Sequence, residues 1–155
     1  SMILSPEMWR KFIKPHLARL FSVAKERNLF IAYHCCGALR PIIPDLIEIG
    51  LDVLNPIQPN CPGMDPVELK KEFGRNVTFM GGVDTQHLLP HGSPKEIYDF
   101  TRKFLDEMTG GGGGYILAAS HTIPPETSIE NIMSLYTAAG IEEDEISRRI
   151  EAHRA

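Results

Sequence analysis

The sequence has no long apolar segment, no run of basic residues and few cysteines, and each absence narrows what the protein can be. A membrane-spanning helix needs about 20 consecutive apolar residues, and no stretch of the 155-residue chain approaches that length. No secretory signal peptide is expected either. The 16 Lys and Arg residues are outnumbered by 20 Asp and Glu, which gives a net charge of −4. Neither a nucleic acid nor a membrane is therefore an expected partner.

Only three cysteines are present, and two of them are adjacent: Cys35, Cys36 and Cys61. An odd number of cysteines with two neighbours makes a poor disulfide framework. We therefore expect a reducing, cytoplasmic setting. There a thiol serves as a metal ligand, as a nucleophile or as a small core residue.

What the chain does contain is an alternation of strand-like and helix-like segments. Apolar runs of strand length lie at residues 29–33, 52–54, 77–80 and 115–119. Helical spacing of apolar residues and capping signals predict the helices between them. These helices are predicted at residues 5–28 with a kink near Pro15, 41–49, 65–74, 93–108, 127–140, with Thr127 in a capping box, and 142–155. We expect the five-glycine run at residues 110–114 to be a flexible connector.

This alternation predicts a parallel sheet covered by helices. An open doubly wound sheet and a (β/α)8 barrel of the TIM type both have this order. A polar side chain follows each predicted strand: His34, Asn55, Asp84 and His121. A barrel brings all of these strand ends to one face, whereas an open sheet separates the outer two. The sequence therefore favours an α/β fold of the (β/α)8 TIM-barrel type with four parallel strand–helix units, half the number in a complete barrel.

We expect a single domain over residues 1–155, with a partial barrel at 3–140 and a helical tail at 141–155. Four units leave two edge strands with unpaired backbone groups and apolar interior side chains in water. A homodimer, or association with a missing N-terminal half, would cover them.

His34, Cys36 and His121 are the candidate metal ligands. Imidazole and thiolate are the usual zinc ligands, and residues 34 and 36 of an extended segment point the same way. Three protein ligands with one open position are typical of catalytic zinc, which turns a bound thiol into a thiolate nucleophile. The alternative is that Cys35 or Cys36 is a small buried residue and that His34 hydrogen-bonds a substrate or a backbone carbonyl.

Asp84 and His34 are the candidate catalytic residues, since both follow a predicted strand. The preceding Gly81-Gly82 permits positive φ or close backbone approach. At the barrel mouth Asp84 would orient a substrate, act as a base or stabilise positive charge; the alternative is a turn-capping Asp. Amide side chains hydrogen-bond without titrating. The candidate substrate contacts are therefore Asp84, Asn55, Gln58 and Gln86, with loop stabilisation as the alternative for Asn55 and Gln58.

Four segments carry a family pattern: His34-Cys35-Cys36-Gly37 and residues 44–55, 79–86 and 112–117. They resemble the C-terminal half of the uroporphyrinogen decarboxylase superfamily, which also holds the corrinoid (cobalamin)-dependent methyltransferases. The similarity runs from about residue 4 to residue 140, and it implies a (β/α)8 barrel.

Two branches of that superfamily differ at these segments. Decarboxylases need no metal and usually read Gly-Asn-Leu-Asp where this chain reads Gly81-Gly82-Val83-Asp84. Methyltransferases bind zinc with His-x-Cys and a later Cys. His34-x-Cys36 matches the first part of this pattern. The later Cys is absent, because the chain reads Ala118-Ala119-Ser120-His121 at that place. Decarboxylases carry a histidine near this place in their pyrrole-binding cleft, so His121 agrees with both branches.

The resemblance therefore implies an enzyme nearest the methyltransferase branch. It would transfer a methyl group between a corrinoid carrier protein and a small-molecule donor or acceptor, with zinc held by His34, Cys36 and His121. One alternative is a decarboxylase of tetrapyrrole carboxylates in porphyrin biosynthesis. The other is a catalytically inactive half-barrel that acts as a binding or assembly module.

Overall fold

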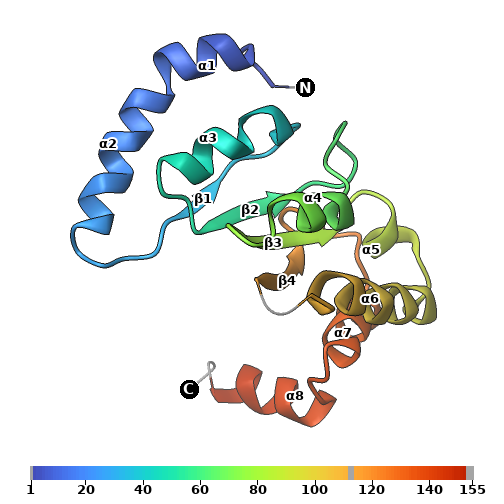
Figure 1. Cartoon of the computed structure of the whole chain (residues 1–155). Coiled ribbons are helices and arrows are strands. Elements are labelled where there is room, and N and C mark those ends of the chain that lie inside the picture. The colour runs from blue at the N-terminus through green and yellow to red at the C-terminus, as the bar shows by residue number, and fades with distance from the viewer. Residues whose placement is uncertain (1, 112–113, 153–155) are drawn as a thin grey trace.

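A four-stranded parallel sheet forms the centre of the protein. The computed structural model describes residues 2–111 and 114–152, so Ser1, the middle of the predicted glycine connector and the end of the predicted tail lie outside the described residues. Strand order follows chain order, and each neighbouring pair is parallel. The strands are β1 (Ala32–His34), β2 (Val53–Ile57), β3 (Thr78–Val83) and β4 (Tyr115–Ala119). The predicted α/β fold with four parallel strand–helix units is confirmed (Figure 1).

Helices precede, connect and follow these strands. Their bounds are α1 (Pro6–Phe12) and α2 (Lys14–Lys25) before β1, the 3-10 helix η1 (Arg40–Ile42) and α3 (Ile43–Glu48) before β2, α4 (Pro66–Phe73) before β3, α5 (Leu88–His91) and α6 (Pro94–Thr109) before β4, and α7 (Ile129–Ala138) and α8 (Glu143–Ala152) after it. The predicted first helix is interrupted at Ile13, two residues before Pro15. Within the described ranges, no helix is both long and apolar enough to cross a bilayer.

Side-chain caps begin three of the four helices for which the sequence predicts a cap. Ser5, Asp65 and Ser93 each accept a hydrogen bond from the backbone N–H of the third helical residue, which satisfies a donor that the helix itself leaves free. The predicted cap at Thr127 is wrong. Ser128 holds the extended cap conformation and accepts the bond, so α7 begins one residue later.

Three strand boundaries differ from the prediction by three residues each. β1 begins at Ala32 rather than at Leu29. β2 continues through Asn55-Pro56 to Ile57, where the sequence predicts a loop, and β3 continues through Gly81-Gly82 to Val83. These two extensions lie on neighbouring strands, and Ile57 pairs with Gly81 across a register shift. Proline and glycine are disfavoured in strands taken alone, so pairing between distant segments decides this region.

One face of the sheet is covered by helices. Tyr33, Leu54, Phe79 and Tyr115 form a row in register across the four strands, and we call the face that carries them the covered face. Leu54 and Phe79 are fully buried. They belong to one apolar cluster with residues of α3, α4 and α6, including Leu46, Leu69 and Ile97. Burying a side chain of this size contributes about 1.5–3 kcal/mol, so this cluster holds the sheet and its helices together.

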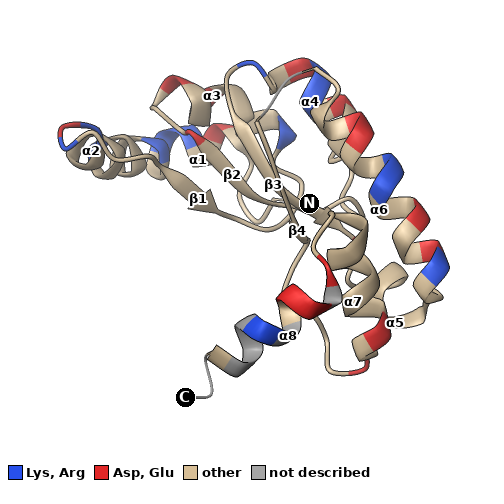
Figure 2. Ribbon diagram, turned by 90° about the horizontal axis from the view of Figure 1, so that it is seen from below, with Lys and Arg blue, Asp and Glu red and all other residues tan. Residues whose placement is uncertain are grey.

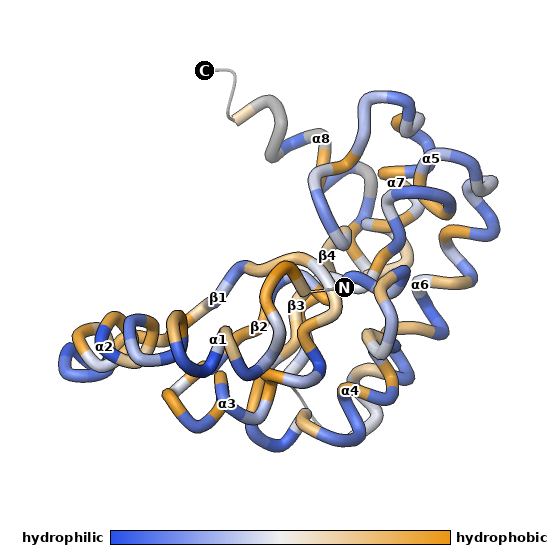
Figure 3. The backbone as a smooth tube through the Cα atoms, turned by 90° about the horizontal axis from the view of Figure 1, so that it is seen from above, coloured by the Kyte–Doolittle hydropathy of each residue, from blue (hydrophilic) through white to orange (hydrophobic). Residues whose placement is uncertain are grey.

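The opposite face, which we call the open face, remains partly accessible within the described part of the chain. Successive strand residues point to opposite sides of a sheet, so the neighbours of the covered row lie here: Ala32, Val53, Thr78, Met80 and Ile116. Ile116 is 43% exposed. Figure 3 shows apolar positions along β2 and β3, and Figure 2 shows charged residues on the helices rather than on the strands. Parallel strands are normally buried on both faces, which makes this surface unusual.

Ion pairs attach α1 and α2 to α3 through Asp45. Its carboxylate accepts hydrogen bonds from Arg10 Nε at 2.9 Å and from Lys14 Nζ at 2.8 Å. Burial by itself raises the pKa of Asp45, but the bonds from Lys14 and Arg10 outweigh it and hold the pKa below its ordinary value. The N-terminal helices therefore depend partly on a carboxylate that must stay ionised.

Candidate functional site

His34, Cys36 and Asn55 form a contiguous polar group at the carboxyl ends of β1 and β2. His34 and Asn55 are register partners on adjacent strands, and the backbone N–H of Cys35 donates to the carbonyl of Asn55 at 2.8 Å. His34 Nδ1 lies 2.7 Å from Asn55 Oδ1. On the other side of the ring, His34 Nε2 lies 3.6 Å from Cys36 Sγ. The imidazole is therefore held between an amide and a thiol.

The two adjacent cysteines lie in different surroundings. Cys35 is half-buried and packs against the core, whereas Cys36 is exposed. Burial raises the pKa of the Cys35 thiol, which the hydrogen bond with Tyr33 only partly offsets. Burial also raises the pKa of Tyr33 to about 12. Cys35 thus remains a neutral thiol at neutral pH, in agreement with the small-core-residue reading, and Cys36 is the one available as a ligand.

His34 and Cys36 have the spacing that two ligands of one zinc ion require. Nitrogen and sulfur at bond lengths of about 2.05 and 2.3 Å, set at the tetrahedral angle, lie about 3.6 Å apart. The observed separation between Nε2 and Sγ is 3.6 Å. Both side chains are exposed, so the pair is accessible to an ion and to a substrate.

The third predicted ligand is not brought to this pair. His121 is exposed and follows β4, at the opposite edge of the sheet from β1. Strands lie about 4.8 Å apart, so three strand spacings separate the two edges by about 14 Å. Among the described residues, no three His, Cys, Asp or Glu side chains lie close enough together to hold a metal. The structure therefore contains two of the three predicted ligands as a pair.

Asp84 lies at the end of β3 in a second polar group. Its carboxylate accepts from the backbone N–H of Gln86 at 2.7 Å and from Asn60 Nδ2 at 2.9 Å, and it lies 3.5 Å from His87 Nδ1. Burial raises the pKa of Asp84, but the hydrogen bonds from Gln86, Asn60 and His87 outweigh it and lower the pKa overall. Asp84 is therefore a carboxylate at neutral pH, and its lowered pKa suits it to stabilising a cation rather than to accepting a proton.

Gly81 and Gly82, at the end of β3 just before Asp84, have the features that the sequence predicts for them. Their φ angles are +110° and +96°, a region that residues with a Cβ rarely adopt. A Cβ on Gly82 would lie 2.6 Å from Phe104 Cζ, and one on Gly81 would lie 3.0 Å from the backbone nitrogen of Ile57. Both predicted reasons for glycine, positive φ and close approach, are confirmed.

The side-chain amides of Gln58 and Asn60 form hydrogen bonds that stabilise the loops of the site. Gln58 Oε1 accepts from the backbone N–H of Gly37 at 3.2 Å, which ties the turn after Cys36 to the end of β2. Asn60 donates to both Asp84 and Gln86. Asn60 is not among the site residues predicted from the sequence, since its only signal there is a polar side chain in a loop after a strand.

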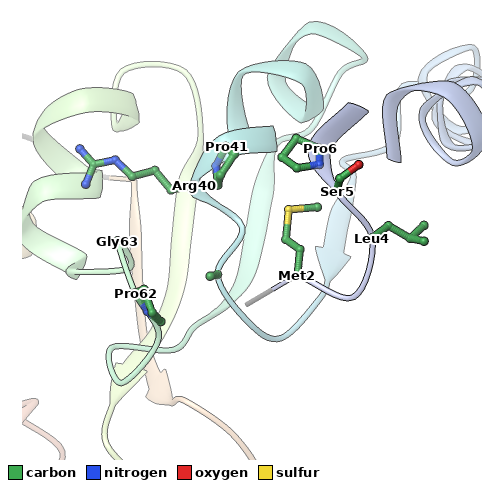
Figure 4. A pocket seen from close by; sticks show the side chains of 9 residues that line it. Met2, Leu4, Ser5, Pro6, Arg40, Pro41, Pro62 and Gly63 are labelled. Carbon is green, nitrogen blue, oxygen red and sulfur yellow. The ribbon is translucent and has the colours of Figure 1, made fainter. Parts of the chain in front are cut away.

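A pocket lies beside this site rather than within it. It measures about 760 Å³ and is lined by Met2, Leu4, Ser5, Pro6, Ala38, Arg40, Pro41, Pro62 and Gly63. In Figure 4 the N-terminal segment and the loop at Pro62 and Gly63 form opposite walls. Arg40 is paired with Glu68 and Glu72. A smaller neighbouring pocket of about 230 Å³ includes Tyr33, Cys35 and Cys36 among its lining residues. Cys36 thus borders an apolar space.

A parallel strand–helix repeat with polar side chains at the carboxyl ends of its strands defines an α/β protein of the barrel type. The family model described as uroporphyrinogen decarboxylase (URO-D) matches residues 1–140. The chain belongs to this family, and the predicted family resemblance is confirmed.

Curated relatives come from both branches of the superfamily. The chain is 26% identical to methylated-thiol–coenzyme M methyltransferase of Methanosarcina mazei, covering 89% of this chain and 34% of that protein. It is 28% identical to uroporphyrinogen decarboxylase of Thermus thermophilus, covering 83% and 35%. It is 26% identical to methylcobamide:CoM methyltransferase MtaA of Methanosarcina barkeri, covering 88% and 37%. The chain thus spans about a third of the length of these relatives.

A solved structure of a methyltransferase from Methanosarcina mazei has the same fold. The TM-score is 0.70 at 24% sequence identity, and the match covers 88% of this chain and 37% of that one. This likeness confirms the barrel-type architecture for the four strand–helix units.

Proposed function

We propose that this chain carries the zinc-binding part of a methyltransferase that works with a corrinoid carrier protein. His34 and Cys36 are two of the zinc ligands; His121, at the opposite edge of the sheet in the single chain, would become the third only when completion of the barrel brings it to them. The observation that carries the proposal is the 3.6 Å separation between His34 Nε2 and Cys36 Sγ, which fits two ligands of one tetrahedral ion. Relatives named as methyltransferases, one of them acting on a methylcobamide, support the reaction class.

In this proposal the chain's own residues bind the ion and position the substrate. Zinc bound here would supply Lewis acidity, which keeps a coordinated thiol in its thiolate form. Asp84, ionised at neutral pH because hydrogen bonds lower its pKa, orients the substrate or attracts its positive charge. Gln86 and Gln58 contact the substrate at the rim, and Gln58 keeps the turn after Cys36 in place through Gly37.

A small molecule is the methyl donor or acceptor, and the setting is the cytoplasm. The chain spans about a third of the length of its relatives, and its four strands do not close an eight-stranded barrel. A second copy of the chain or an N-terminal half would cover the open face and its exposed Ile116. Either one would also surround the ligand pair, which is exposed in the single chain.

Zinc analysis of the purified chain tests the proposal, with the two adjacent cysteines as a matched pair. We expect stoichiometric zinc in the wild type and in Cys35→Ala, because Cys35 is turned into the core. We expect loss of zinc in Cys36→Ala with unchanged circular dichroism. A wild type that folds without taking up zinc, or equal zinc in both variants, would contradict the proposal.

A second candidate is decarboxylation of a tetrapyrrole carboxylate, which the 28% identity to the Thermus thermophilus decarboxylase supports. There Asp84 would accept hydrogen bonds from pyrrole nitrogens and His121 would contact a carboxylate side chain. Consumption of uroporphyrinogen by zinc-free protein, lost in Asp84→Asn, would favour this reaction. A folded chain with neither zinc nor turnover would leave the binding or assembly module.

A further inference from the structure

Asn55 holds His34 from the side opposite to Cys36. The two residues are register partners on β2 and β1, and His34 Nδ1 lies 2.7 Å from Asn55 Oδ1. Asn55 is itself fixed, because it lies within β2 and its carbonyl accepts from the backbone N–H of Cys35. The sequence leaves substrate contact and loop stabilisation open for Asn55, and in the structure its side chain contacts His34.

The contact determines which ring nitrogen carries the proton. An amide oxygen is an acceptor only, so the bond requires a proton on Nδ1 of His34. A neutral imidazole has a single ring proton, which leaves Nε2 with a free lone pair. Nε2 is the atom that faces Cys36 Sγ at 3.6 Å. A histidine ligand is commonly oriented in this way by an acceptor behind its other nitrogen.

We propose that Asn55 is a positioning residue, which fixes His34 as the Nδ1–H tautomer and turns Nε2 toward the Cys36 side. The tautomer can be observed without any metal. Its consequence, tighter zinc binding at His34 and Cys36, rests on the function proposed above. Asn55 would touch neither the ion nor the substrate, and it would act only through the imidazole.

Nitrogen-15 NMR of the metal-free full chain tests the tautomer at about pH 8, where an ordinary imidazole is neutral. His34→Gln identifies the ring signals of residue 34. We expect a protonated Nδ1 and an unprotonated Nε2 in the wild type and in Asn55→Asp, whose carboxylate also accepts. In Asn55→Leu the two tautomers should interconvert. The opposite tautomer in the wild type overturns the proposal, whether or not the Asn55 variants fold. An unchanged His34 signal in a folded Asn55→Leu also overturns it.

Zinc titration gives the second readout. We expect Asn55→Leu to weaken zinc binding about 10–100-fold and Asn55→Asp to retain it. Asn76→Leu, an exposed amide away from the site, should change nothing. Equal affinity in Asn55→Leu and wild type would overturn the positioning role. A wild type with the expected tautomer but without zinc would instead overturn the proposed function and leave the tautomer assignment standing.

Discussion

The two faces of the sheet differ sharply although they belong to the same short strands. On the covered face, Leu54 and Phe79 are fully buried under helices, whereas Ile116 on the open face is 43% exposed. Both faces carry rows of side chains across the strands, but only the covered face is packed against a layer of helices. Stability of the chain is therefore expected to come mainly from one side of the sheet, and the other side is left for association or for the rest of a barrel.

The largest effect is expected at the covered face. Phe79→Ala should lower the free energy of unfolding by about 3–5 kcal/mol, because removal of this fully buried ring leaves a cavity in the core. Met80→Ala, the next residue along β3, provides the control on the open face and should cost clearly less. Urea denaturation monitored by circular dichroism gives both values. Equal losses would show that the two faces are packed alike.

A smaller effect is expected where α1 and α2 meet α3. Asp45→Asn should cost about 1–2 kcal/mol at neutral pH, since it weakens bonds from Arg10 and Lys14 that are partly screened by water. The pKa of Asp45 is lowered in the folded state, so its contribution is present above about pH 4, the unfolded value, and disappears as the pH falls through the folded value.

The difference in unfolding free energy between wild type and Asp45→Asn should therefore shrink below about pH 4. Glu48→Gln is the matched control. Glu48 pairs with the same Lys14, but its side chain is 71% exposed, and we expect less than about 0.5 kcal/mol. A difference for Asp45→Asn that stays constant down to low pH would contradict the assigned role of its charge.

The smallest effect on folding is expected at the open face. Ile116→Glu should change the unfolding free energy by less than about 1 kcal/mol, because the side chain is already 43% exposed. The same change should abolish self-association, since a buried unpaired charge is strongly unfavourable in an interface. Sedimentation velocity distinguishes the monomer from the self-associated form. A wild type that is monomeric, or a variant that still associates, would show that a second copy does not cover this face.

The sequence predicts the order of the elements well and their limits less well. Local signals such as Ser93 with Glu96 define helix starts because the capping contacts are made within four residues. The extensions of β2 through Asn55-Pro56 and of β3 through Gly81-Gly82 were missed because each depends on pairing with the other strand. Local propensity opposes strand at proline and glycine, and tertiary pairing overrides it.

In the site, too, contacts within one segment could be predicted from the sequence, and contacts between strands could not. His34 and Cys36 are two residues apart, so strand geometry alone predicts that they point the same way, and they are 3.6 Å apart. His121 lies at the far edge strand, where its position depends on sheet curvature and on the remainder of the barrel. The bond between His34 and Asn55 joins residues on different strands, and it needs the register of β1 and β2 to be known.

X-ray absorption spectroscopy of the zinc-loaded chain tests the central claim most directly, namely that His34 and Cys36 hold the ion together. We predict a mixed first shell with one sulfur at about 2.3 Å and imidazole nitrogen at about 2.0 Å, and loss of the sulfur contribution in Cys36→Ala but not in Cys35→Ala. A first shell of nitrogen and oxygen only, or a sulfur contribution that persists in Cys36→Ala, would contradict it.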